Sequence, residues 1–140
     1  MAAQVRNTMR SFFVVLLLGI TGCASSPLPP ASEVTKIDIT ITNAPADVAV
    51  ETKKTTLDKR ADINEVMAWL QSINWSQSGT DMAVIGIPQP DGGIVLTTKA
   101  GATQDYGFYW NGNFVNARAN RLLHGADMTK WKQVVQRLCK

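Results

Sequence analysis

Isoleucine occupies every second position between Ile37 and Ile41, and polar residues fill the positions between them. Side chains of a β-strand point alternately to opposite faces of a sheet, so this pattern predicts a half-buried strand over residues 36–42. Such a strand needs a sheet with a hydrophobic core on one side. Residues 43–47 have the composition of a turn, and residues 48–52 are expected to form a second, short strand.

Two later segments have the hydrophobic spacing of helices. The first carries an apolar stripe with a period of three to four residues, made of Ile63, Val66, Met67, Leu70 and Ile73. Asp58 or Asp62 is expected to cap its start; Trp69 widens the stripe and Trp75 follows the helix. The second helix is expected to begin at Asp127 as N-cap, with a stripe of Met128, Trp131, Val134, Val135 and Leu138.

Residues 83–117 have the pattern of an antiparallel meander. Short apolar runs at 83–87 and 94–98 are separated by Pro, Asp and Gly at 88–93, which indicate a turn, and Gly101 lies in the next expected turn. Segments 106–110 and 113–117 flank Asn111-Gly112, which predicts a hairpin with a two-residue type I′ turn.

The order of these elements predicts the fold class. Strands that follow one another without crossover helices form an antiparallel sheet, and amphipathic helices cover its apolar face. We therefore expect a two-layer α+β domain over residues 36–140. Its antiparallel sheet has four to six strands with two amphipathic helices packed on one face, in the order β-β-α-β-β-β-β-α.

Residues 1–22 have the three-part organisation of a secretion signal. Arg6 and Arg10 give the start a positive charge, and residues 12–20 form an apolar stretch of nine residues. A helix needs about 20 apolar residues to cross a bilayer, so this stretch is too short for a transmembrane helix.

The residues that follow this stretch are Ile20, Thr21, Gly22 and Cys23. This pattern resembles the lipobox of bacterial lipoproteins. The resemblance implies cleavage between Gly22 and Cys23, diacylglycerol on the Cys23 thiol and an acyl chain on the new amino terminus. Separately, we expect no cofactor. Without an Asp at position 24, the resemblance also implies the outer membrane, facing the periplasm, in a Gram-negative host. The alternative is a buried cysteine in a short apolar helix.

Residues 23–35 are expected to link the anchor to the domain. Residues 24–32 hold three prolines and three serines without apolar periodicity, a composition typical of an extended spacer. A docking motif for a partner is the alternative reading of this segment.

The overall charge does not predict a nucleic-acid partner. The isoelectric point is about 9.0, but of the 14 basic residues, Arg6 and Arg10 lie in the expected signal segment, which leaves 12 against 11 acidic ones. Binding of phosphate backbones needs a concentrated basic surface, which a net charge of +1 does not provide.

Few residues suggest catalysis or metal binding. His124 is the sequence's single histidine, and Cys139 is the one thiol that remains if Cys23 is acylated. A Cys–His pair is conceivable, but His124 is expected in a loop and Cys139 at a fraying helix end. Asp91 and Gly92-Gly93 have the composition of a turn and not of a phosphate-binding loop. We expect no catalytic or metal site.

Two features are candidate binding surfaces. The first is the basic segment 118–140, whose residues include Arg118, Arg121, Lys130 and Lys132; a solvated helix face is the alternative. The second is the aromatic segment with Tyr106, Phe108, Tyr109 and Trp110, for which packing in a second layer is an equal alternative.

These expectations describe a lipid-anchored cell-envelope protein. The expected activity is non-enzymatic binding of an envelope protein or a cell-wall component. The alternatives are an inhibitor of a periplasmic enzyme and, third, a small hydrolase.

Overall fold

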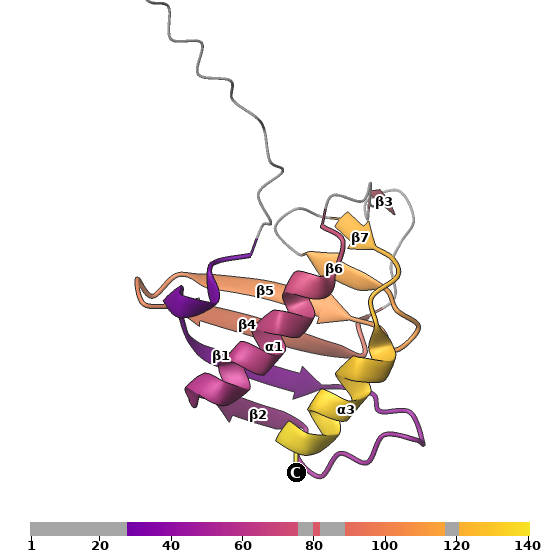
Figure 1. Cartoon of the computed structure of the whole chain (residues 1–140). Helices are drawn as coiled ribbons and strands as arrows, with labels where there is room; N and C mark the ends of the chain where they lie inside the picture. The colour runs from indigo at the N-terminus through magenta and orange to yellow at the C-terminus, as the bar shows by residue number, and fades with distance from the viewer. Residues whose placement is uncertain (1–27, 76–79, 82–88, 117–120) are drawn as a thin grey trace, which may run out of the picture.

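The computed structural model describes residues 28–75, 80–81, 89–116 and 121–140, and it has the expected α+β class (Figure 1). Two helices lie on one face of an antiparallel sheet. The expected signal segment, Gly22, Cys23, the apolar run 83–87 and Arg118 lie outside the described residues.

The described elements follow one another in a simple order. They are η1 (Ala31–Glu33), β1 (Val34–Ile41), β2 (Lys54–Leu57), α1 (Arg60–Ser72), β3 (Thr80–Asp81), β4 (Gly92–Thr98), β5 (Thr103–Phe108), β6 (Phe114–Asn116), β7 (Arg121–Leu123) and α3 (Met128–Leu138). Across the sheet the order is β2-β1-β4-β5-β6-β7-β3. Among the described strands, six have three or more residues and follow the predicted order β-β-α-β-β-β-β-α, while the two-residue β3 only pairs with β7.

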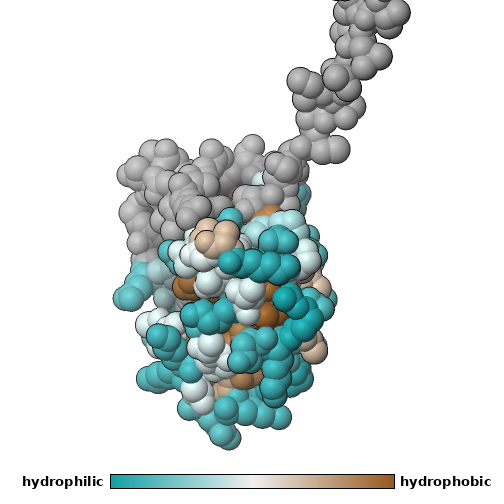
Figure 2. Space-filling view, turned by 90° about the vertical axis from the view of Figure 1, so that its left-hand side faces the viewer, coloured by the Kyte–Doolittle hydropathy of each residue, from teal (hydrophilic) through white to brown (hydrophobic). Residues whose placement is uncertain are grey.

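The predicted periodicities are confirmed by burial. Ile37, Ile39 and Ile41 of β1 face the helices and are at most 3% exposed. The stripes of α1 and α3 pack on the same side of the sheet and meet in two stacked rings, Trp69 and Trp131, with centroids 4.2 Å apart. In side view, hydrophilic residues cover most of the described surface and hydrophobic ones show between them (Figure 2).

The second strand does not lie at 48–52, as the sequence predicts, but at Lys54–Leu57. Its position is set by the register with β1, in which Ile37 lies opposite Leu57. Val48 is nevertheless buried. Its N–H donates a hydrogen bond to the Pro45 carbonyl, and the resulting turn places the Val48 side chain against the core. The apolar character of Val48 therefore reflects its burial and does not indicate a strand.

The start of α1 has no side-chain cap, so the predicted capping by Asp58 or Asp62 is wrong. Lys59 is the N-cap residue, and Asp62 lies in the first turn, where a negative charge favours the helix dipole. The Arg60 side chain instead donates hydrogen bonds to the carbonyls of Ala31 and Val34, at 2.9 and 3.0 Å, and so ties the helix to η1 and β1.

The hairpin between β5 and β6 has a three-residue loop and not the predicted two-residue type I′ turn. The Gly112 N–H donates to the Tyr109 carbonyl at 3.1 Å, which centres the turn on Trp110 and Asn111. Gly112 follows at φ +92°, a conformation that glycine adopts at little cost. The sequence pattern therefore predicts the hairpin correctly, but the predicted turn differs from the observed turn by one residue.

The folded part begins before residue 36. Leu28 and Ala31 pack against the core, η1 follows, and Val34 at the start of β1 is fully buried. The Lys99 N–H also donates to the Glu33 carbonyl at 2.9 Å. Residues 28–35, which the sequence assigns to the spacer, are therefore attached to the domain.

Candidate functional site

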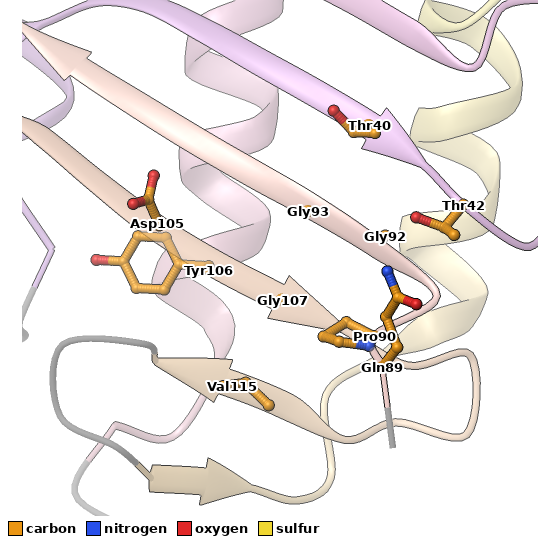
Figure 3. Close-up of a pocket in the computed structure, with 10 residues that line it drawn as sticks. All are labelled: Thr40, Thr42, Gln89, Pro90, Gly92, Gly93, Asp105, Tyr106, Gly107 and Val115. Carbon is orange, nitrogen blue, oxygen red and sulfur yellow. The ribbon is translucent and has the colours of Figure 1, made fainter. Parts of the chain in front are cut away.

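The sheet face opposite the helices carries a shallow pocket of about 430 Å³ (Figure 3). Its middle follows one row across four strands, because Thr40 on β1 lies opposite Gly93 on β4, Gly93 opposite Gly107 on β5, and Gly107 opposite Val115 on β6. Side chains around this row complete the lining: Thr42, Gln89, Pro90 and Asp105. The pocket is thus a trough whose floor is main chain of β4 and β5.

Three glycines lie at or beside this floor, and two of them are required by packing. A Cβ on Gly92 would lie 2.6 Å from the Thr40 carbonyl oxygen, and one on Gly107 would lie 2.8 Å from Cγ of Pro90. A Cβ on Gly93 would meet nothing nearer than the Tyr106 carbonyl oxygen at 3.6 Å. Of these three glycines, only Gly93 could carry a Cβ without a close contact. The sequence interpretation of Gly92-Gly93 as turn residues is wrong, because both belong to β4.

The rim of the pocket carries polar side chains that have no partner among the described residues. Thr40, Thr42, Gln89 and Asp105 are exposed, and none of these side chains makes a hydrogen bond or ion pair with the described residues. Two hydroxyls, one amide and one carboxylate therefore face solvent around an apolar floor. Of the described residues that line the pocket, none is a histidine, cysteine, lysine or arginine, so the groups present offer hydrogen bonding.

The predicted aromatic surface is wrong for the residues that face the helices. Tyr106 and Phe108 belong to the main core at 4% and 0% exposure. Trp110 packs edge-on against Phe108 and donates its indole N–H to the Asn43 carbonyl at 2.6 Å. These rings fill the core, which the sequence pattern had left as the alternative.

Tyr109 lies on the opposite face, as the alternation along the strand predicts, but it is only 7% exposed. It forms a small second cluster with Val115 and Leu122. Burial, and secondarily the charge of Asp91, raise the pKa of the Tyr109 hydroxyl. Packing therefore accounts for Tyr109, and no exposed aromatic patch results.

The predicted basic surface is largely neutralised by acidic residues far away in sequence. Lys132 lies 2.7 Å from Asp47, and Arg137 pairs with Asp62 at 3.4 Å and also with Glu65. Lys130 is exposed on the first turn of α3. For Arg121 the structure describes only the main chain in β7, and Arg118 lies outside the described residues. Two of the described basic side chains of this segment, Lys132 and Arg137, are thus held in ion pairs, whereas Lys130 is exposed.

The candidate Cys–His pair does not form. His124 precedes α3 and is exposed, with Nδ1 2.7 Å from Oδ1 of Asn113, whereas Cys139 ends α3 (Figure 1). Cys139 is 1% exposed, and its carbonyl accepts hydrogen bonds from the N–H groups of Glu51 and Thr52 at 3.2 Å each. Burial raises the pKa of its thiol. The expected fraying of this helix end is therefore wrong.

Across the described ranges, no three His, Cys, Asp or Glu side chains gather as a metal site would require. In the same ranges, every helix is too short or too polar to cross a bilayer. No protein-family model, curated protein or solved structure matches this chain. The open-face pocket is therefore judged by its own chemistry.

Proposed function

We propose that this chain is a lipid-anchored protein of the bacterial cell envelope and a non-enzymatic binding module for an envelope protein or a cell-wall component. The anchor is supported by the lipobox-like residues Ile20 to Cys23 directly after a short apolar stretch. The proposed lipids are diacylglycerol and an N-acyl chain on Cys23. Two or more acyl chains give stable membrane attachment, whereas one gives reversible attachment.

The observation that carries the binding role is the pocket on the open face of the sheet. It combines an apolar floor with polar side chains that have no partner in the described part of the chain, Thr40, Thr42, Gln89 and Asp105. Pockets that bind small ligands share this combination of an apolar lining and a few polar groups. The pocket also lies on a continuous sheet, which holds these groups at fixed spacings.

In a Gram-negative host, the proposed location is the outer membrane, facing the periplasm, since Ala24 follows the lipidated cysteine. Five peptide links separate Cys23 from Leu28, which packs on the core. Even a fully extended chain of this length spans at most about 18 Å. The domain would therefore stay close to the membrane surface, nearer than a spacer extending to residue 35 would hold it.

The mass of the protein from native membranes tests the anchor. The expected mass is that of a chain starting at Cys23 plus its acyl groups, and a Cys23→Ala variant should stay unlipidated and leave the membrane fraction. A full-length, unmodified mass would overturn the anchor.

Cross-linking in intact cells tests the binding role separately. A partner captured by the unaltered chain should be lost in the Thr40→Val variant. The same partner should remain with Thr97→Val, a matched change on the same face outside the pocket lining. Equal capture by both variants would contradict binding through the pocket.

A further inference from the structure

Gly93 is a glycine that the fold itself does not require. It lies inside β4, where glycine weakens a strand because it has no side chain to pack and loses more conformational entropy than other residues. Packing explains Gly92 and Gly107, but a Cβ on Gly93 would make only an ordinary van der Waals contact, and Gly93 lines the pocket. A glycine inside a strand without a packing reason is typical of a place where a ligand approaches the backbone.

The floor around Gly93 is apolar and wide. Gly93 lies opposite Gly107, and the ring of Pro90 packs where a Cβ on Gly107 would lie, so bare main chain is exposed on this floor at Gly93. The ring of Pro90 and the methyl groups of Val115 border this floor (Figure 3). A flat ligand with an apolar face can rest there.

The polar side chains of the rim determine which groups the edge of a bound ligand must carry. The hydroxyls of Thr40 and Thr42 donate and accept, the Gln89 amide does both, and the Asp105 carboxylate accepts two or more hydrogen bonds. A ligand that covered this rim with apolar groups would leave these polar atoms unsatisfied, which is unfavourable. The ligand's edge must therefore carry several hydroxyl or amide groups.

The charge of the pocket excludes anionic ligands. Asp105 has no partner among the described residues and repels a phosphate or carboxylate at the same place, and the described lining residues include no lysine or arginine. An uncharged sugar ring has the remaining properties, an apolar C–H face and a rim of hydroxyls. The volume of about 430 Å³ lies in the range of pockets that bind small ligands.

We propose that the open-face pocket binds one or two uncharged sugar rings of a cell-wall glycan strand. The source of the glycan rests on the proposed function, whereas the sugar chemistry rests on the pocket alone. The floor at Gly93 and Gly107 receives the face of a ring. Thr40, Thr42, Gln89 and Asp105 bond its hydroxyl and amide groups.

The test is an NMR titration of the ¹⁵N-labelled full chain in detergent with the disaccharide of N-acetylglucosamine. The amide signals of Gly93, Gly107 and Asp105 should shift in a saturable way. In Gly93→Val the affinity should fall at least about tenfold, equivalent to 1.4 kcal/mol. The thermal midpoint of Gly93→Val should stay equal or rise, because valine favours strands and a Cβ there meets no close atom.

Two further variants keep the test decisive if Gly93→Val folds poorly. Thr40→Val and Asp105→Asn should each weaken the disaccharide severalfold, while Thr97→Val binds like the unaltered chain. The absence of saturable shifts up to the solubility of the sugar would overturn the proposal, as would equal affinity in Thr40→Val and Thr97→Val. Stronger shifts of the same amides by a short lysine-containing peptide would also overturn it. Lipidation of Cys23 is read from the mass and not from this titration, so the two proposals fail separately.

Discussion

The indole N–H of Trp69 donates a hydrogen bond of 2.8 Å to the main-chain oxygen of Asp127. This bond connects α1 to the N-cap residue of α3. The Trp69 ring also stacks on Trp131, one turn into α3. Both rings are fully buried, but among the described residues the indole nitrogen of Trp131 has no hydrogen-bond partner. The two tryptophans are therefore equal in burial and different in hydrogen bonding.

This difference predicts unequal effects of the same substitution. Trp69→Phe removes a hydrogen bond and leaves the Asp127 carbonyl without that donor, whereas Trp131→Phe removes none. We expect Trp69→Phe to lower the free energy of unfolding by about 1 kcal/mol more than Trp131→Phe, measured by urea denaturation. An equal or larger loss in Trp131→Phe would contradict the assigned hydrogen bond.

Asp127 caps α3 through its side chain, which accepts a hydrogen bond from the Lys130 N–H at 3.2 Å. Asp127→Ala should lower the free energy of unfolding by about 1 kcal/mol, the usual effect of losing an N-cap. Asp127→Asn is the matched control, because asparagine also caps helices well. If the alanine and asparagine variants were equally stable, capping would not be the role of this side chain.

Asp38 predicts an acid-sensitive contribution to stability. The Thr56 hydroxyl donates to its carboxylate at 2.5 Å and the Lys36 ammonium lies 3.2 Å away, and these interactions lower the pKa of Asp38. A lowered folded-state pKa stabilises the fold above the unfolded value of about 3.9, and this contribution is lost as the pH falls through the folded-state pKa.

Carbon-detected NMR titration measures this pKa directly. Thr56→Val should raise the pKa of Asp38 toward its ordinary value and flatten the acid dependence of stability. Thr97→Val, a matched change on the same sheet face, should leave the Asp38 pKa where it is. A Thr56→Val variant with an unchanged Asp38 pKa would show that the hydroxyl is not the main cause.

Arg137 links the two helices through Asp62 and Glu65 of α1. The side chains are partly exposed, so Arg137→Gln should lower the free energy of unfolding by at most about 1 kcal/mol. The loss should shrink at high salt, because salt screens exposed charges. Lys130→Gln is the control, since no ion pair of the described residues involves Lys130, and its effect should be close to zero at any salt concentration.

Cys139 should react slowly with thiol reagents, because its side chain is 1% exposed and burial raises its pKa. The measurement is iodoacetamide labelling of the full chain with Cys23→Ala, which leaves Cys139 as the single thiol. The rate in buffer should be at least about a hundredfold below the rate in urea, since labelling then requires opening of the fold. Equal rates would mean that the end of α3 is open in solution.

Local patterns predict the elements that carry one strong signal. The alternating isoleucines locate β1, the apolar stripes locate both helices, and Asp127 marks the start of α3. Each signal depends on residues close together in the chain. Such a signal predicts which face of the element is buried in any fold that covers one face of that element.

Elements that depend on distant residues were not predictable in this way. The position of β2 follows from its register with β1, and the short β7 is held by pairing with β6 and β3. The ion pair of Lys132 with Asp47 joins residues 85 positions apart. A basic stretch in the sequence therefore says little about the charge of a surface.

The pocket was missed because its two decisive glycines lie far apart in the sequence. Only the pairing of β4 with β5 brings Gly93 opposite Gly107. One available signal was that Gly93 directly precedes the apolar run of β4, where a glycine inside a strand is unusual. The neighbouring Pro90, Asp91 and Gly92 favoured a turn instead.

The stacked indoles of Trp69 and Trp131 also give the protein an optical signature. Two such rings 4.2 Å apart and 18° from parallel couple their electronic transitions, and this coupling contributes a pair of bands of opposite sign to the circular dichroism spectrum. This pair of bands depends on both helices being packed together, because each ring comes from a different helix. Its disappearance on heating reports separation of the helix layer without any label, and the same spectrum verifies the folding of every pocket variant.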